Sequence, residues 1–222
     1  MAGPIRIAVI NPNSTASMTD KIAAAARIAA PGVEIVALTC LGAPPAIQGP
    51  EDGALAVPFL LVRVIAAAKA GADAAIIACF DDTGLAEARA AVSIPVLGIG
   101  EAAFHAAMML GNRYSVVTTL SVSVPVIAQN IRDYGLESHC LKVRAAEVPV
   151  LELEREGSDA RAKISAEISR AVAEDGAGAI VLGCAGMADL AAALELEHGL
   201  PVIDGVAAAT AFAEALVRMR QR

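Results

Sequence analysis

The sequence predicts an α/β protein of two pseudo-symmetric lobes, each a mostly parallel four-stranded sheet with helices on both faces. Short runs of Val, Ile, Ala and Leu alternate with Ala-rich stretches of helical length, which is typical of βαβ units around a parallel sheet. The same order of segments occurs twice in the 222 residues. Hydrophobic residues make up 56% of the chain but aromatic residues only 3%, so we expect a mainly aliphatic core.

The first half of the chain carries clear signals for strands and helices. Polar residues from Ser17 to Asp20 are typical of a helix start, and Pro31-Gly32 indicates where that helix ends. A loop rich in proline and glycine, residues 39–53, leads to a second helix. We expect strands at 6–10, 33–38, 74–78 and 95–98, and helices from about residue 17 and over 54–70.

The second half repeats this order. Residues 113–117 match 6–10, and the Leu-Pro-Val of 200–202 matches the Ile-Pro-Val of 94–96. The clearest match is "GADAAIIAC", which ends at Cys79, against "GAGAIVLGC", which ends at Cys184. A repeat this long is too large for a solenoid unit and predicts two similar lobes.

We expect the division between the lobes to follow this repeat. The predicted N-terminal lobe comprises residues 1–99 and 207–222, and the predicted C-terminal lobe comprises residues 100–206. In open parallel sheets, ligands bind beyond the carboxyl ends of the strands. The sequence therefore predicts an active-site cleft between the lobes.

Cys79 and Cys184 end matching strands, each beside residues that can start a helix. A helix N-terminus lowers the pKa of a nearby thiol, so we expect thiolate character. A buried, inert cysteine is the commoner fate of a free thiol, but the matched placement favours a catalytic role. Gly183 and Gly186 are expected to leave space for a ring beside Cys184. Cys40 and Cys140 lack such loops and are expected to be structural.

Two acid/base groups on opposite faces of one ligand suit the transfer of a proton across a carbon atom. One thiolate removes the proton and the opposite thiol returns one, while backbone N–H groups at the helix starts stabilise the enolate oxygen. Such chemistry needs no cofactor, and the four cysteines show no metal-ligand spacing. We therefore expect no cofactor and no metal.

Polar residues after the first strand of each half are further candidates for ligand binding. These are Asn13, Ser14 and Thr15 in the first half and Thr118 and Thr119 in the second; turn or capping roles are the alternative. "GIGEAA", residues 98–103, fits a loose dinucleotide pattern, but no acidic residue ends the next strand. Asp81 and Asp82 are expected to cap a helix rather than hold a metal.

Charge and hydropathy exclude several classes of partner. The net charge of −7 without a basic cluster argues against nucleic acids and anionic membranes. The longest uncharged window, 114–131, contains Pro125 and several hydroxyl residues and makes a poor membrane span. The N-terminal residues 1–6 run directly into a strand-like segment without a signal region, so we expect a cytoplasmic protein.

The chain resembles the hydantoin racemase family, which includes allantoin racemases, within the aspartate/glutamate racemase superfamily. The matching stretches, in order along nearly the whole chain, are "INPNST" (10–15), "ACFDDTGL" (78–85), "GEAAFHAAMMLG" (100–111), "YSVVTTL" (114–120), "LGCAGMADL" (182–190) and "PVIDGVAAA" (201–209). The sequence departs from the family pattern at Asp81 and Thr83, where Gly and Pro are expected.

The resemblance implies a two-lobed fold and cofactor-independent racemisation by two cysteines, which fall here on Cys79 and Cys184. It also implies that the loops hold a cyclic ureide, a 5-substituted hydantoin or allantoin, as the small-molecule partner. The substrate-binding residues would be Asn13, Ser14, Thr15, Phe80, Thr118, Thr119, Gly183, Ala185 and Gly186. Family assemblies are homo-oligomers, and the largely apolar segment 55–65 is expected to contribute to a subunit interface.

Other functions remain open at this point. Within the superfamily, the alternatives are an amino-acid racemase, a maleate isomerase or an arylmalonate decarboxylase. The decarboxylase would need only the second cysteine, and dicarboxylate substrates would favour Lys or Arg in the loops, which contain none. A non-catalytic small-molecule binding module is the alternative from another class, but binding alone needs no paired thiols.

Overall fold

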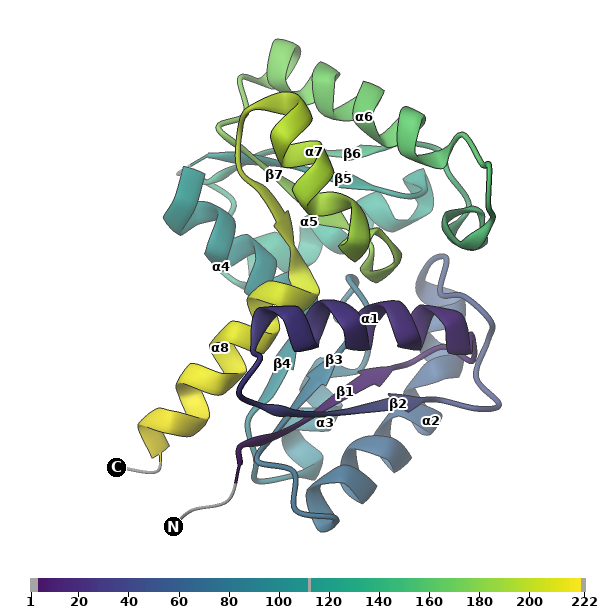
Figure 1. Ribbon diagram of the computed structural model, residues 1–222. Helices are drawn as coiled ribbons and strands as arrows, with labels where there is room; N and C mark the ends of the chain where they lie inside the picture. The colour runs from purple at the N-terminus through teal and green to yellow at the C-terminus, as the bar shows by residue number, and fades with distance from the viewer. Residues whose placement is uncertain (1–3, 112, 221–222) are drawn as a thin grey trace.

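The computed structural model describes residues 4–111 and 113–220; residues 1–3, 112 and 221–222, which include both ends of the predicted N-terminal lobe, lie outside them. The chain folds into two lobes stacked one above the other (Figure 1). The elements of the first half are β1 (Arg6–Asn11), α1 (Ala16–Ala29), β2 (Glu34–Thr39), α2 (Pro50–Lys69), β3 (Ala74–Ile77), α3 (Leu85–Ala91), β4 (Val96–Gly98) and α4 (Ile99–Gly111).

The second half repeats the strand–helix order with short extra helical turns. Its strands are β5 (Tyr114–Thr118), β6 (Cys140–Ala145), β7 (Ala179–Gly183) and β8 (Val202–Asp204). Its α-helices are α5 (Val124–Asp133), α6 (Ala160–Arg170), α7 (Ala191–His198) and α8 (Gly205–Arg220). The short turns are η1 (Ser121–Ser123), η2 (Val150–Glu154), a π-helical turn η3 (Ala171–Asp175) and η4 (Ala185–Leu190).

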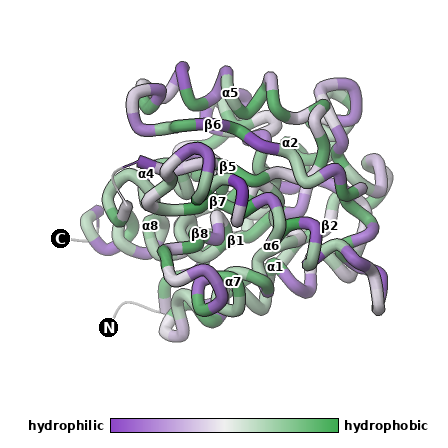
Figure 2. The backbone as a smooth tube through the Cα atoms, turned by 90° about the horizontal axis from the view of Figure 1, so that it is seen from above, coloured by the Kyte–Doolittle hydropathy of each residue, from purple (hydrophilic) through white to green (hydrophobic). Residues whose placement is uncertain are grey.

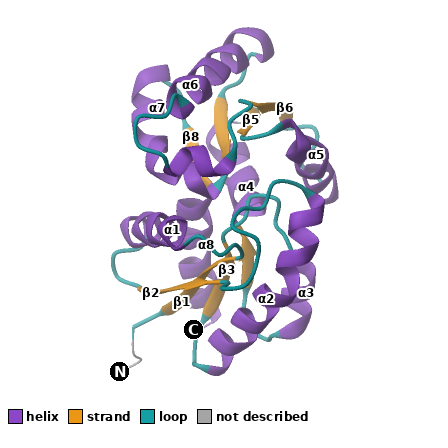
Figure 3. Ribbon diagram, turned by 90° about the vertical axis from the view of Figure 1, so that its right-hand side faces the viewer, coloured by secondary structure: helices purple, strands orange, loops and turns teal. Residues whose placement is uncertain are grey.

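The two sheets have the same topology. Their strand orders are β2-β1-β3-β4 and β6-β5-β7-β8, and every neighbouring pair is parallel. Helices lie on both sides of each sheet, with α1 and α2 on opposite faces of the first (Figure 3). The predicted fold class is confirmed, and the matching strand orders account for the repeat seen in the sequence.

The central strands are buried on both faces, which explains their continuous apolar sequences. In β1, Ile7 and Val9 face a core shared by the two lobes, whereas Ala8 and Ile10 face the core beneath α2. β7 alternates in the same way, with Val181 in the shared core and Ile180 in the core beneath α6. Figure 2 shows the contrast with α5, a surface helix on which hydrophobic and hydrophilic positions alternate.

One helix from each half crosses to the other lobe. α4 follows β4 directly but packs against β5 and β7, and α8 follows β8 but packs against β1, β3 and β4. The starts of the two helices meet so closely that a Cβ on Gly205 would lie 2.5 Å from the carbonyl oxygen of Ile99. This exchange, together with α1 between its own sheet and the C-terminal lobe (Figure 1), joins the lobes through one hydrophobic core.

The prediction for the second helix was too short. We expected a start at residue 54, but α2 begins at Pro50, with Glu51 and Asp52 in its first turn. Proline fits the first turn of a helix because its missing N–H would have no partner there. Over the described part of the chain, the structure contains no helix that is long and apolar enough to cross a membrane.

Candidate active site between the lobes

A narrow cavity of about 30 Å³ lies at the carboxyl ends of the central strands of both sheets. Segments that follow β1, β3, β5 and β7 all contribute to it, as expected for parallel sheets. Its lining residues are Pro12, Asn13, Met18, Ile47, Ala78, Cys79, Phe80, Asp81, Thr119, Ser123, Val150, Gly183, Cys184 and Ala185. The two cysteines predicted from the repeat therefore face one cavity, one from each lobe.

Cys79 lies just beyond β3, where the chain turns before α3. Its Sγ atom is 3.4 Å from the hydroxyl of Thr83 and also accepts a hydrogen bond from the backbone of Asp81. Both contacts favour the thiolate. Thr83, at a position where the family resemblance implies Pro, thus supplies a hydroxyl beside the first thiol.

Cys184 lies just beyond β7 and directly precedes η4. Its thiol interacts with the backbone of Gly186, two residues further along, as Cys79 does with Asp81. The side chain packs on Met18, Ala46 and Val150. The two thiols therefore have equivalent backbone settings, which is the local consequence of the repeated sequence.

The expectation that helix termini lower the pKa of these thiols is wrong. Burial, together with a smaller contribution from the negative charge of Asp81, raises the pKa of both Cys79 and Cys184 to about 12. The backbone hydrogen bonds oppose this effect but are weaker than the loss of solvation. In the closed cavity both cysteines are neutral thiols at pH 7.

Only part of the polar loop after β1 faces the cavity. Asn13 is buried in the lining, where its side-chain oxygen accepts hydrogen bonds from Asn11 and from the backbone of Thr15. Ser14 and Thr15 bond instead to the loop after β2, through the carbonyl oxygens of Pro44 and Pro45. These two residues hold the loop and do not line the cavity.

The second set of predicted binding residues divides in the same way. Thr119 lines the cavity, whereas the hydroxyl of Thr118 donates to the carbonyl oxygen of Gly183 at 2.9 Å and ties β5 to β7. A Cβ on Gly183 would lie 2.7 Å from the Thr118 backbone, so strand packing by itself requires a glycine at this position of the lining. Gly186 lies beside Leu153, Met18 and Cys184 and does not line the cavity. Phe80 and Ala185 do line it.

Asp82 caps a helix, as expected, but the helix is α4 rather than the one that follows its own loop. Its carboxylate accepts hydrogen bonds from the backbone N–H groups of Gly100 and Glu101, at 3.0 and 2.8 Å, and from the Tyr134 hydroxyl at 2.8 Å. A Cβ on Gly98 or Gly100 would collide with this carboxylate. The glycines that resembled a dinucleotide loop therefore make room for Asp82.

Several lining residues were missed by sequence reasoning. Ile47 and Val150 come from the segments after β2 and β6, and Met18 comes from the first turn of α1. None belongs to a recognisable motif, but the repeat offered one signal, because each lobe contributes a hydrophobic residue after its second strand. Asp81 was expected to serve as a cap, yet it lines the cavity.

The η2 segment contributes Val150 to the cavity lining from the C-terminal lobe. The backbone N–H of Val150 donates to the side-chain oxygen of Gln48 at 3.0 Å. Lys21 of α1 donates to the carbonyl oxygen of Leu153 and pairs with Glu154, both at 2.9 Å. Segments of both lobes are thus linked to each other beside the cavity.

A larger groove of about 760 Å³ lies elsewhere, beside the edge strand β4 and between α3, α4 and α8. Its walls are mostly apolar and neither Cys79 nor Cys184 reaches it. Within residues 4–111 and 113–220, no group of three His, Cys, Asp or Glu side chains is placed to hold a metal ion. The paired thiols therefore identify the smaller cavity as the candidate active site.

Comparisons with known proteins agree with this fold. The Asp/Glu/hydantoin racemase family profile matches residues 7–213. The hydantoin racemase of Rhizobium meliloti is 47% identical over 214 residues, which are 96% of this chain and 89% of that protein. The allantoin racemase structure from Klebsiella pneumoniae has a TM-score of 0.95 at 44% identity, with coverage of 97% of this chain and 89% of that one.

A more distant structure shows the same fold alone. Glutamate racemase from Bacillus anthracis is 18% identical, with a TM-score of 0.72 over 97% of this chain and 82% of that one. The match to the family covers nearly the whole sequence and includes both lobes. The chain is therefore an isomerase of the racemase type, and it belongs to the Asp/Glu/hydantoin racemase family.

Proposed function

We propose that this racemase acts on 5-substituted hydantoins or allantoin, without a cofactor, by two-base proton transfer between Cys79 and Cys184. The observation that carries the proposal is that both thiols, from matching strand ends in the two lobes, line one cavity. The relatives named hydantoin racemase and allantoin racemase, at 47% and 44% identity, support the substrate class.

The reaction would occur at C5, the ring carbon next to a carbonyl group. One cysteine, as thiolate, removes the C5 proton, and the electron pair moves into an enolate. The thiol on the opposite face then donates its proton to the same carbon, which inverts the configuration and leaves a thiolate on that side. Atoms and charge balance, because one proton leaves and one arrives, and the two cysteines exchange protonation states.

The raised thiol pKa has two opposing effects in this scheme. At neutral pH it leaves little thiolate in the closed cavity, but the thiolate that forms is a strong base. A strong base suits a carbon acid. The sequence led us to expect that backbone N–H groups stabilise the enolate oxygen. The N–H groups of Asp81 and Gly186 are instead directed at the sulfurs, so they stabilise the thiolates. We assign the ring contacts to Asn13, Phe80, Thr119 and Ala185.

Substrate binding would require the cavity to widen. Its volume of about 30 Å³ is far below the roughly 300–1,000 Å³ typical of small-molecule sites. The η2 segment donates a hydrogen bond to Gln48 and is contacted by Lys21 through one hydrogen bond and one ion pair, and these links are few enough to break and re-form. Closure over the ring would exclude water from the reacting carbon.

The proposal is tested by proton exchange with solvent. Single enantiomers of several 5-substituted hydantoins and of allantoin are incubated with the enzyme in deuterated water. We expect loss of optical rotation together with deuterium at C5, and the rates rank the substrates. Retention of both optical rotation and the C5 proton in every compound would overturn the proposed function.

A further inference from the structure

Asp81 lines the cavity with the two cysteines, and its carboxylate lacks a strong partner. The hydroxyl of Ser123 is 3.4 Å from its Oδ2 atom, at the long end of the hydrogen-bond range. Among the residues that the structure describes, no cation pairs with it. Asp82, next in the chain, instead accepts hydrogen bonds from three donors that face away from the cavity.

The position of Asp81 is fixed by the backbone. Its N–H is directed at the sulfur of Cys79, and its carbonyl oxygen accepts a hydrogen bond of 2.9 Å from Asn130 of α5. The side chain therefore extends from a segment that is anchored in both lobes. Asp81 lines the same cavity as Cys79 and Cys184, and its negative charge raises the pKa of both thiols.

The surroundings of this carboxylate make it decisive for ligand choice. Met18, Ile47, Phe80 and Val150 give the cavity mainly apolar walls, and among the described residues that line it Asp81 is the one with a charge. A carboxylate that has lost water without gaining a cation or good donors is unfavourable. A ligand that brings N–H donors to it regains that free energy, whereas an anionic ligand adds repulsion.

We propose, on the basis of the proposed function, that Asp81 selects hydantoins whose 5-substituent carries N–H donors, charged or neutral, and rejects those with an acidic substituent. The 5-substituent is attached to the carbon that the thiols would flank, and Asp81 lines the same cavity as both thiols. An ammonium group and the neutral ureido group of allantoin share this donor chemistry, and the ammonium group gains more from the charge.

The test compares matched substrates in matched variants. Values of kcat/KM for racemisation are measured at pH 8 with 5-(3-aminopropyl)hydantoin, its near-isostere 5-butylhydantoin, allantoin and 5-(2-carboxyethyl)hydantoin. For the wild type we expect the amine to exceed the butyl compound by roughly 10- to 100-fold, as for a hydrogen bond to a charged group. Allantoin should lie between them, and the acid should be poorest.

The variant Asp81→Asn keeps the size of the side chain and removes its charge. We expect the amine-to-butyl ratio to fall towards one and the acid to improve relative to the butyl compound. Asp133→Asn, the same change at an exposed position at the end of α5, should leave all ratios unchanged. An unchanged ratio in Asp81→Asn, or an equal loss for all four substrates, would overturn this inference and leave the proposed function intact.

A second readout needs no variant. Burial raises the pKa of Asp81 to about 6, so the amine preference of the wild type should decline as pH falls below that value. Cys79 and Cys184 stay protonated in this pH range. The carboxyl of Asp82 is bonded to the start of α4, so its titration would change the rates with the amine and the butyl compound together and leave their ratio unchanged. A ratio constant from pH 5 to pH 8 would contradict the assignment. Racemisation of none of the four compounds would instead overturn the proposed function, and this inference with it.

Discussion

The two cysteine loops begin alike and then diverge. In each, the thiol follows a buried central strand and interacts with the backbone two residues further on. At that second position the first loop has Asp81, with a carboxylate in the cavity, whereas the second has Gly186, with no side chain. One residue later the first loop has Asp82, bonded to α4 and Tyr134, and the second has Met187, packed in the outer core of its own lobe.

The features that the two loops share are those that the proposed two-thiol chemistry requires, and the features that differ are additions of one lobe. The shared features place a thiol at each side of the cavity with an N–H group directed at the sulfur. The first loop adds a charge that acts on both thiols, and a buried carboxylate that connects α4 to α5. We therefore expect equal effects when either thiol is changed and unequal effects elsewhere in the loops.

The largest expected effect is the loss of racemisation when either thiol is replaced. Cys79→Ser and Cys184→Ser should each lower the rate by at least about 1,000-fold, because a serine hydroxyl is too weak an acid to supply the base at neutral pH. Polarimetry on single enantiomers measures this. Cys40→Ser and Cys140→Ser are the controls, and their racemisation rates should stay near that of the wild type. A near wild-type rate in either catalytic variant would mean that the two loops are not equivalent.

The next effect is on stability and concerns Asp82. Asp82→Ala removes the cap of α4 and leaves the Tyr134 hydroxyl without this acceptor, so the free energy of unfolding should fall by roughly 2–3 kcal/mol. Denaturant unfolding measures the loss. Tyr134→Phe should cost about 1 kcal/mol in the wild type and almost nothing in Asp82→Ala. Additive losses would show that the two side chains do not act through one bond.

The third effect is on pH dependence. The proposed mechanism needs a thiolate, and the pKa of both thiols is raised to about 12, so the rate should rise with pH above neutrality. Asp81 contributes to that elevation by repulsion, so Asp81→Asn should lower both thiol pKa values and move the rise to lower pH. Rates with allantoin from pH 6 to pH 10 measure the shift. A rise that moves to higher pH in the variant would contradict the assigned sign.

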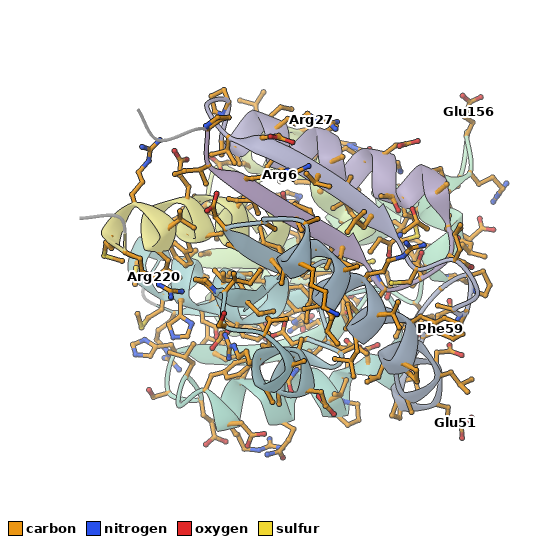
Figure 4. The ribbon with its side chains drawn as sticks, turned by 90° about the horizontal axis from the view of Figure 1, so that it is seen from below. Arg6, Arg27, Glu51, Phe59, Glu156 and Arg220 are labelled. Atoms are coloured by element: carbon orange, nitrogen blue, oxygen red, sulfur yellow. The ribbon has the colours of Figure 1, made fainter. Side chains whose placement is uncertain are left out.

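The next prediction concerns subunit assembly and the outer face of the first lobe. α2 exposes Leu55 and Val62 by 62% and 65%, and Phe59 lies at the periphery of the molecule (Figure 4). α6, at the corresponding place in the second lobe, exposes charged residues instead. We expect α2 to meet another subunit, so Leu55→Lys with Val62→Lys should lower the mass in light scattering. A monomeric wild type with full activity would contradict this.

No effect is expected from removing metal ions. In the proposed mechanism the thiol pair supplies both the proton acceptor and the proton donor, so exhaustive dialysis against a chelator should leave the racemisation rate unchanged. Added pyridoxal phosphate should also have no effect. The measurement is the rate before and after dialysis, with and without added divalent metal. A lasting loss that only metal restores would refute cofactor independence.

The sequence predicted the parts of this molecule that local patterns determine. The apolar runs and their repeat placed most strands within a residue or two and put Cys79 and Cys184 at matching strand ends. The thiol pKa was predicted with the wrong sign, because burial depends on distant segments, as when Val150 and Met18 pack against Cys184. The partners of Asp82 are 18 or more residues away, and no local pattern indicates them.

The most direct test of the two-thiol account is enantiomer-resolved exchange in the single variants. With Cys79→Ser or Cys184→Ser in deuterated water, NMR follows loss of the C5 proton from each pure enantiomer of one hydantoin. Each remaining thiol reaches only one face of C5, so the two variants should exchange opposite enantiomers without inverting either. Exchange of the same enantiomer by both variants, or of both enantiomers by one, would contradict the assignment of one cysteine to each face.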